Sequence, residues 1–142
     1  MDAYKVLLGE ILIQRKRITR EQLDAALVVQ KDKGGFLGEI LVNQGILDER
    51  DIVVALVIQC GLPYIAVNKY TIDPAIVRLI PKEVALQERV IALDRIGEIL
   101  SVVMVNPLTD EKKSYLESLT KCRVATFIST KGEIEEAIAR NY

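Results

Sequence analysis

The sequence has no histidine and no tryptophan among its 142 residues. Without histidine, the chain cannot supply a histidine general base, a catalytic triad of the serine protease type or a histidine metal ligand. It also lacks the GxxxxGK[ST] phosphate loop and the GxGxxG dinucleotide signature. No carboxylate pair or nucleophile with a partner base stands out either, so we expect a protein that is not an enzyme.

Cysteines and long apolar runs are also scarce. Cys60 and Cys122 stand alone without CxxC spacing, which predicts two buried, reduced thiols and no zinc site or redox pair. Apolar runs such as "ILSVVMV" fall far short of the ~20 residues that cross a bilayer. The first residues do not show the pattern of a cleaved export signal. We therefore expect a cytosolic protein that does not insert into a membrane.

The charge is nearly balanced, with 19 basic and 20 acidic residues and a pI of about 5.6. Nucleic-acid-binding domains carry a strongly basic face, so a nucleic acid polymer is not an expected partner. Half of the residues are apolar, which is enough to bury a core. Composition alone therefore predicts a globular protein and leaves its partner open.

The most informative feature is an internal repeat. The segment "LLGEILIQRKRITREQLDAALVVQ", residues 7–30, returns as "FLGEILVNQGILDERDIVVALVIQ", residues 36–59. Apolar residues recur at helical spacing in both copies, and each copy reads as two short helices. Thr19 with Gln22 has the spacing of a capping box, Gly45 suits a left-handed helix end, and Asp48 can cap the next helix. We expect residues 1–60 to form four short helices that pack together.

The sequence pattern changes after Cys60, where the helical repeat ends. A connecting segment with two prolines leads to two short helices. The first is expected to begin at "IDP", and the second is expected in "IPKEVALQERV". The runs "VIAL" and "ILSVVMVN" predict a hairpin with Gly97 at its turn, and "RVATFIS" predicts another strand. Helices are expected at "DEKKSYLESLTK" and after Thr130, which has capping-box spacing to Glu133. Residues 61–142 therefore predict a small three-stranded sheet with helices packed on it, and the whole chain is α+β.

Several repeat residues admit a structural and a functional explanation. Gly9 and Gly38 lie inside predicted helices, where each costs up to ~1 kcal/mol relative to alanine. Close packing of the two related helices would compensate, as would a ligand's close approach, and the pattern favours packing. Gln30 and Gln59 end the copies and can read a base edge, although glutamines at helix ends are commonly solvated. A basic cluster could attract phosphates but is typical of a solvated surface: Arg15, Lys16, Arg17, Arg20, Lys31 and Lys33.

The duplicated LGxxL…Q unit resembles the N-terminal domain of type II secretion and type IV pilus assembly ATPases, whose ligand-binding version is called the MshEN domain. The stretches "CGLPYIAV", "IDPAIVRLIPKEVALQERVIAL" and "ILSVVMVNPL" look like the rest of that domain, so the resemblance covers essentially the whole chain. In that family the domain precedes a hexameric ATPase motor and docks on an inner-membrane assembly protein. The resemblance implies a docking or regulatory domain, peripheral to the inner membrane through its partner, with a motor in the same or another chain.

The competing hypothesis is a sensor for cyclic di-GMP, which some family members bind. The family motif opens with Arg-Leu-Gly and has glycine at its tenth position, whereas this chain has Leu7 and Phe36 for the arginines and Lys16 for the first glycine. Neither replacement of arginine can donate a hydrogen bond to guanine, a contact worth about 1–3 kcal/mol. The positions that match the family's ligand residues are Leu8, Gly9, Leu12, Leu23, Leu27, Gln30, Leu37, Gly38, Leu41, Gly45, Leu56 and Gln59. No other cofactor and no metal is expected.

Overall fold

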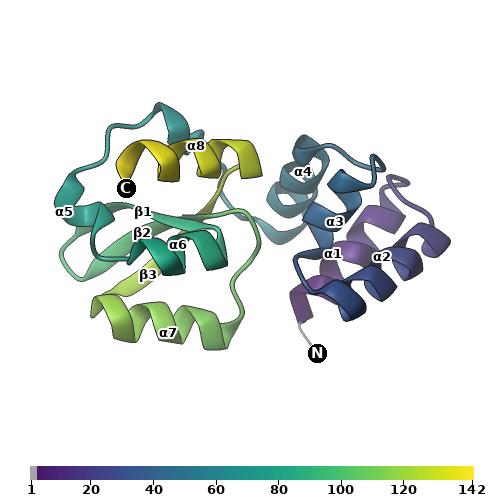
Figure 1. Ribbon diagram of the computed structural model, residues 1–142, viewed down its shortest axis with the longest axis horizontal. Helices are drawn as coiled ribbons and strands as arrows, with labels where there is room; N and C mark the ends of the chain where they lie inside the picture. Colours follow the sequence, from purple (N-terminus) through teal and green to yellow (C-terminus); the bar gives the residue numbers. More distant parts are fainter. Residues whose placement is uncertain (1–2) are drawn as a thin grey trace. The chain divides into compact units, whose positions relative to one another are not determined.

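The computed structural model describes the backbone of residues 3–142 and the side chains of residues 8–58 and 61–142. The chain divides into two compact units, residues 1–61 and residues 62–142. The first, the helical unit, consists of helices in its described part, and the second, the sheet unit, combines helices with a three-stranded sheet (Figure 1). The predicted α+β class is confirmed.

The helical unit follows the repeat, with two helices in each copy. They are α1 (Ala3–Gln14), α2 (Arg20–Lys33), α3 (Leu37–Asn43) and α4 (Glu49–Cys60). The predicted capping box begins α2: the Thr19 hydroxyl accepts the Gln22 N–H at 3.1 Å, and the Gln22 side chain accepts the Thr19 N–H at 2.9 Å. Asp48 caps α4 in the same reciprocal way. These caps satisfy backbone donors that short helices cannot pair internally.

The helices pack in a pattern that respects the duplication. Helix α2 packs on α3, and α1 packs on α4. Exchanging the two copies turns one of these contacts into the other, so the unit has an internal two-fold relation. Each first helix is therefore covered by the second helix of the other copy.

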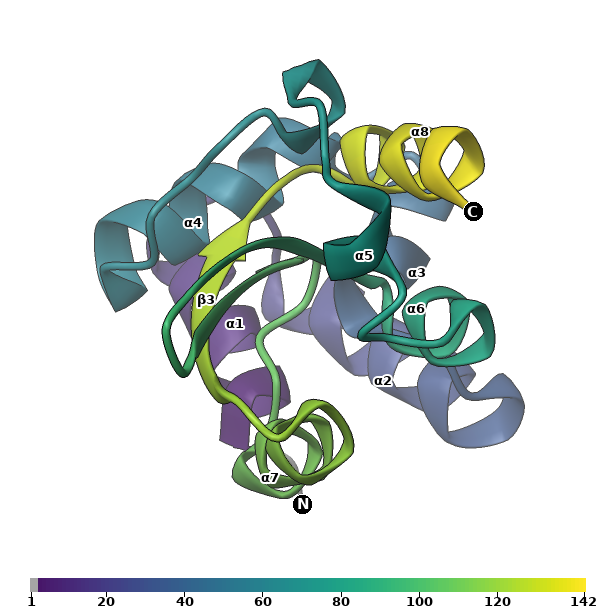
Figure 2. The same cartoon turned by 90° about the vertical axis from the view of Figure 1, so that its left-hand side faces the viewer.

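The sheet unit contains the remaining elements. They are η1 (Val67–Lys69), α5 (Pro74–Val77), α6 (Lys82–Glu88), β1 (Val90–Ile96), β2 (Ile99–Met104), α7 (Asp110–Thr120), β3 (Arg123–Ile128) and α8 (Lys131–Asn141). Helices α5, α6 and α8 pack against β1, and α7 packs against β3. Figures 1 and 2 show α6 and α8 on one side of the strands.

The strands form a mixed sheet in the order β1-β2-β3. β1 and β2 are the predicted antiparallel hairpin, and Gly97 has φ +60° in the tight turn between Ile96 and Ile99. β3 runs parallel to β2 after the α7 connection. The Glu117 carboxylate on α7 accepts the Val124 N–H at 3.0 Å, which occupies a donor of this edge strand.

Sheet and helices close over one apolar core. Its members include the fully buried Ile91, Leu100 and Ile134, contributed by β1, β2 and α8. The Cys122 thiol is free and buried, as predicted, whereas the prediction for Cys60 falls on a side chain outside the described ones.

Residues 62–69, which we call the strap, cross β3 and the start of α8. The Ile128 N–H donates to the Pro63 carbonyl at 2.8 Å, and the Ile65 N–H donates to the Ile128 carbonyl at 2.9 Å. The buried Ser129 hydroxyl donates to the Ile65 carbonyl and accepts the Val67 N–H. The segment expected to be a connection is thus hydrogen-bonded to Ile128 at the end of β3 and to Ser129.

Candidate functional site

The repeat glycines lie where two helices of the same copy meet. An ideal Cβ on Gly9 would stand 2.8 Å from Leu23 Cδ1, and one on Gly38 would stand 3.3 Å from Ile52 Cδ1. The expectation of packing is met, but the nearest neighbour is the second helix of the same copy and not the related glycine's helix. The missing side chains let α1 approach α2, and α3 approach α4.

The predicted ligand leucines belong mainly to the core of the helical unit. Those with buried side chains are Leu8, Leu12, Leu23, Leu37, Leu41 and Leu56. Leu27 is the exception, with 39% of its surface exposed. These six leucines therefore offer little exposed surface to a ligand on this unit.

Gln30 performs a structural task that its position in the repeat does not reveal. It is only 9% exposed, and its Nε2 donates to the Gly35 carbonyl at 2.9 Å. Gly34, with φ +74°, donates its own N–H to the Gln30 carbonyl. These two bonds fold the loop between the copies and bring the end of α2 next to Phe36, the N-cap of α3. The Gln59 side chain is outside the described ones.

The helix turns of the two copies are equivalent despite their different residues. Lys16 has φ +59° and Gly45 has φ +74°, so lysine occupies a left-handed position that glycine fills in the second copy. A non-glycine residue pays about 1–2 kcal/mol in this region. Lysine in place of the family's glycine at position 16 therefore preserves the left-handed turn but makes it strained.

Two of the six residues in the basic cluster have carboxylate partners. The Arg20 guanidinium donates to both Glu10 oxygens, at 2.9 and 3.1 Å, and Arg17 lies 3.5 Å from Asp51. The hydrogen bonds from Arg20 lower the pKa of Glu10. Lys31 is exposed near the end of α2. The cluster thus retains fewer free cations than its sequence indicates.

Large apolar side chains are exposed on the outer faces of α2 and α4. Val28 and Ile58 each have 60% of their surface exposed, and Val54 has 38%. Single exposed aliphatic residues are ordinary, but Leu27 joins Val28 on one helix, and Val54 joins Ile58 one turn apart on the other. These four residues, the apolar patches of the helical unit, are surfaces that a partner protein can bury.

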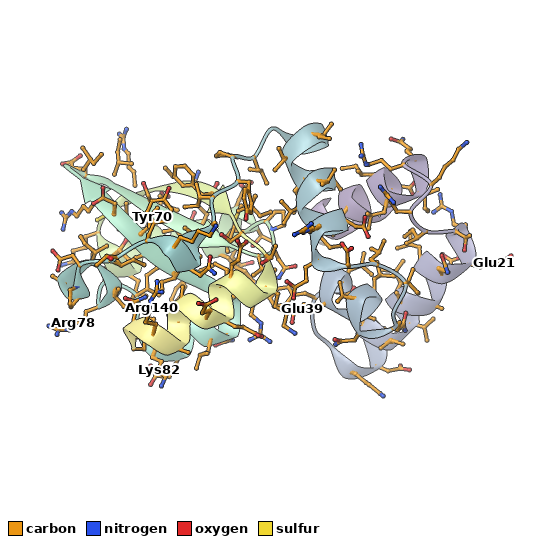
Figure 3. All side chains as sticks on the ribbon, turned by 90° about the horizontal axis from the view of Figure 1, so that it is seen from above. Glu21, Glu39, Tyr70, Arg78, Lys82 and Arg140 are labelled. Carbon is orange, nitrogen blue, oxygen red and sulfur yellow. The ribbon has the colours of Figure 1, made fainter. Side chains whose placement is uncertain are left out.

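The sheet unit carries a surface that the sequence did not indicate. Arg140 Nη2, in the last turn of α8, donates to the Tyr70 carbonyl at 2.9 Å. Arg78 and Lys82 are exposed beside the turn between α5 and α6, and Figure 3 shows all four side chains at the same end of this unit. They are spread across the second half of the chain, so no local pattern joins them.

Among the described residues, no group of histidine, cysteine, aspartate and glutamate side chains could hold a metal ion. No helix in the same part of the chain has the length and hydrophobicity needed to span a bilayer.

Residues 60–142 match the model of the MshEN domain family. Over 135 residues the chain is 33% identical to the type IV pilus assembly ATPase PilB of Myxococcus xanthus, and over 137 residues it is 32% identical to that of Thermus thermophilus. Each match covers 95% of this chain but only 24% and 15% of those proteins. The chain thus spans a quarter or less of these curated relatives. Bacteriophage adsorption protein B of Escherichia coli is 33% identical over 86 residues, 61% of this chain and 11% of that protein.

Two solved structures have a similar fold. MshE with cyclic di-GMP matches with a TM-score of 0.74 and 26% identity, over 95% of this chain and 98% of that one. The N-terminal domain of XpsE matches with a TM-score of 0.78 over 100% of this chain and 98% of that one, and at 17% identity it supports the fold alone. The expected resemblance is confirmed.

Proposed function

Because the chain belongs to the MshEN domain family, we propose that it is a non-enzymatic docking and regulatory domain of a type II secretion or type IV pilus assembly ATPase. Its partner is an inner-membrane assembly protein of such a system, and the motor lies in the same or another chain. The domain acts on the cytoplasmic side of the inner membrane, which it reaches through that partner.

The observation that carries the docking function is the pair of apolar patches on α2 and α4. Val28 and Ile58 are each 60% exposed, although their chemistry favours burial. Burying a fully exposed side chain of this kind is worth about 1.5–3 kcal/mol, and a partner that covers the exposed part of both would gain a large share of that from each. The near-neutral net charge is compatible with an interface that is apolar at its centre.

Binding to purified cytoplasmic segments of assembly proteins tests this function, with biolayer interferometry as the readout. The variant Val28→Ser/Ile58→Ser should weaken binding by about tenfold or more because both anchors lose apolar area. Glu21→Ser/Arg50→Ser is the matched control, since both residues are exposed on the same helices. Docking is wrong if the unaltered chain binds no such segment.

A second candidate function is recognition of cyclic di-GMP, and a specific observation favours it. MshE, 26% identical and of the same fold, has been solved with cyclic di-GMP. That ligand consists of two identical halves, and the helical unit has an internal two-fold relation of its own. The end of α2 at Gln30 lies next to the start of α3 at Phe36, and one half of the ligand would bind there.

The same site explains why affinity should be low. Gln30 already donates to Gly35, and Phe36 offers no hydrogen bond to a guanine. If the ligand binds, Leu7→Arg/Phe36→Arg should strengthen binding by about tenfold or more, because each arginine restores a contact of about 1–3 kcal/mol. Isothermal titration calorimetry measures both proteins. Absence of heat for the chain and for the double arginine variant would exclude this function.

A further inference from the structure

The sheet unit exposes several cations together with an aromatic and an aliphatic side chain. Tyr70 is 46% exposed and Leu86 is 44% exposed. Lys82 and Leu86 are one turn apart on the same face of α6. The cationic surface, as we call it, consists of Lys69, Tyr70, Arg78, Lys82, Leu86 and Arg140.

Hydrogen bonds to the end of α8 hold the parts of this surface together. Arg140 binds the Tyr70 carbonyl, which fixes the segment after η1. Two residues further on, the Tyr142 hydroxyl lies 2.7 Å from the Ile80 carbonyl and 3.1 Å from the Val77 carbonyl. The last turn of α8 therefore bridges the segments that carry the other cations. Figure 3 shows Tyr70, Arg78, Lys82 and Arg140 gathered there.

The charges of the cationic surface are open to a partner. Within the described part of the chain, no carboxylate forms an ion pair with Arg78 or Lys82. Three carboxylates lie in the same region. Asp73 accepts the Ala75 N–H at 2.9 Å, Glu136 accepts the Asn68 side-chain amide at 3.0 Å, and Glu83 is exposed on α6.

Resting on the docking function, we propose that the cationic surface binds an acidic segment of the partner protein that also carries apolar side chains. Arginine and tyrosine are enriched among residues that dominate binding energy, and here the Arg140 guanidinium is held by its hydrogen bond to the Tyr70 carbonyl. Charge complementarity specifies an acidic partner, which Arg78 and Lys82 attract, and Leu86 adds apolar area.

A labelled helical peptide with glutamate and leucine along one face is the probe, and fluorescence anisotropy measures its binding to the full chain. Arg78→Glu/Lys82→Glu should weaken binding at least about fivefold. Lys113→Glu/Arg123→Glu makes the same charge change at exposed positions elsewhere in the sheet unit and should leave binding near that of the unaltered chain. A peptide with lysine for glutamate should not bind.

The outcomes separate this proposal from the docking function. Equal loss in both double variants would reveal nonspecific charge attraction and overturn the proposal. Binding to vesicles containing phosphatidylserine, with none to the peptide, would overturn it in favour of a lipid. The same variants are then tested against the assembly-protein segments: unchanged capture overturns the cationic surface but leaves docking intact. If the unaltered chain captures no segment while the peptide result holds, docking fails and the preference for acidic peptides stands.

Discussion

The two repeat glycines offer a matched test of how closely the helices approach each other. Both Gly9→Ala and Gly38→Ala add a methyl group to a helix, and the gain in helix propensity is about 1 kcal/mol for Gly9, inside α1, and less for Gly38, the second residue of α3. The space available differs. The new methyl at Gly9 would lie 2.8 and 2.9 Å from the two Leu23 δ-carbons, whereas at Gly38 the nearest atom, Ile52 Cδ1, is 3.3 Å away.

These distances set the expected magnitudes. Contacts below 3.0 Å force the buried Leu23 to move, and overpacking of this kind costs about 1–3 kcal/mol. Gly9→Ala should therefore be neutral to ~2 kcal/mol destabilising. A shift of a few tenths of an ångström relieves the contact at Gly38, so Gly38→Ala should be neutral to ~1 kcal/mol stabilising. The two variants should differ by about 1–2 kcal/mol in the same chain.

Urea unfolding followed by far-UV circular dichroism measures these differences. A double-mutant cycle provides the control: Leu23→Ala should cost about 2–5 kcal/mol in the unaltered chain and clearly less beside Gly9→Ala, since the new methyl fills part of the cavity. Equal stability of the two glycine variants, or strict additivity in the cycle, would refute the close approach of α1 to α2.

Three further predictions concern single side chains. Lys16→Gly should raise the unfolding free energy by about 0.5–1 kcal/mol in urea, because it removes left-handed strain that outweighs the flexibility glycine adds to the unfolded chain; a loss would contradict the strain. Gln30→Ala should lower it by about 1 kcal/mol by leaving the Gly35 carbonyl without its donor, and unchanged stability would show that the bond contributes nothing. Burial raises the pKa of Tyr142 to about 12 from 10.0, so its stabilisation is complete below pH 10 and is lost as the pH rises towards 12. Tyr142→Phe should flatten that loss in pH-dependent thermal melts, and an identical alkaline profile would contradict it.

Local signals predicted much of the fold. The capping residues Thr19, Asp48 and Thr130 are each followed by the second cap residue three positions later, so the helix starts could be read from a few letters. Gly97 between two β-branched runs likewise marks the hairpin turn. These features depend on neighbours in the chain, and sequence patterns contain that information.

Features that depend on distant residues could not be predicted in the same way. Nothing in the sequence near the strap indicates that it forms hydrogen bonds with Ser129, because these residues lie more than 60 positions apart and meet only in the folded sheet unit. The cationic surface depends on α8 bringing Arg140 to Tyr70. The position of Gln30 in the repeat suggested a ligand contact. In the structure its side-chain amide donates to the Gly35 carbonyl and closes the loop between the copies. The ligand roles of the repeat residues remain predictions.

The strap also limits the length of the connection that precedes it. Helix α4 ends at Cys60, and the first bond to the sheet is made by the Pro63 carbonyl, so only Gly61 and Leu62 lie between. Three Cα–Cα steps join Cys60 to Pro63, which is about 10–11 Å at full extension. Gly61, with φ +67°, ends α4 in the left-handed conformation that glycine adopts readily. From Pro63 onward the chain is hydrogen-bonded to Ile128, so a protease that cuts the connection after α4 has only Gly61 and Leu62 as targets.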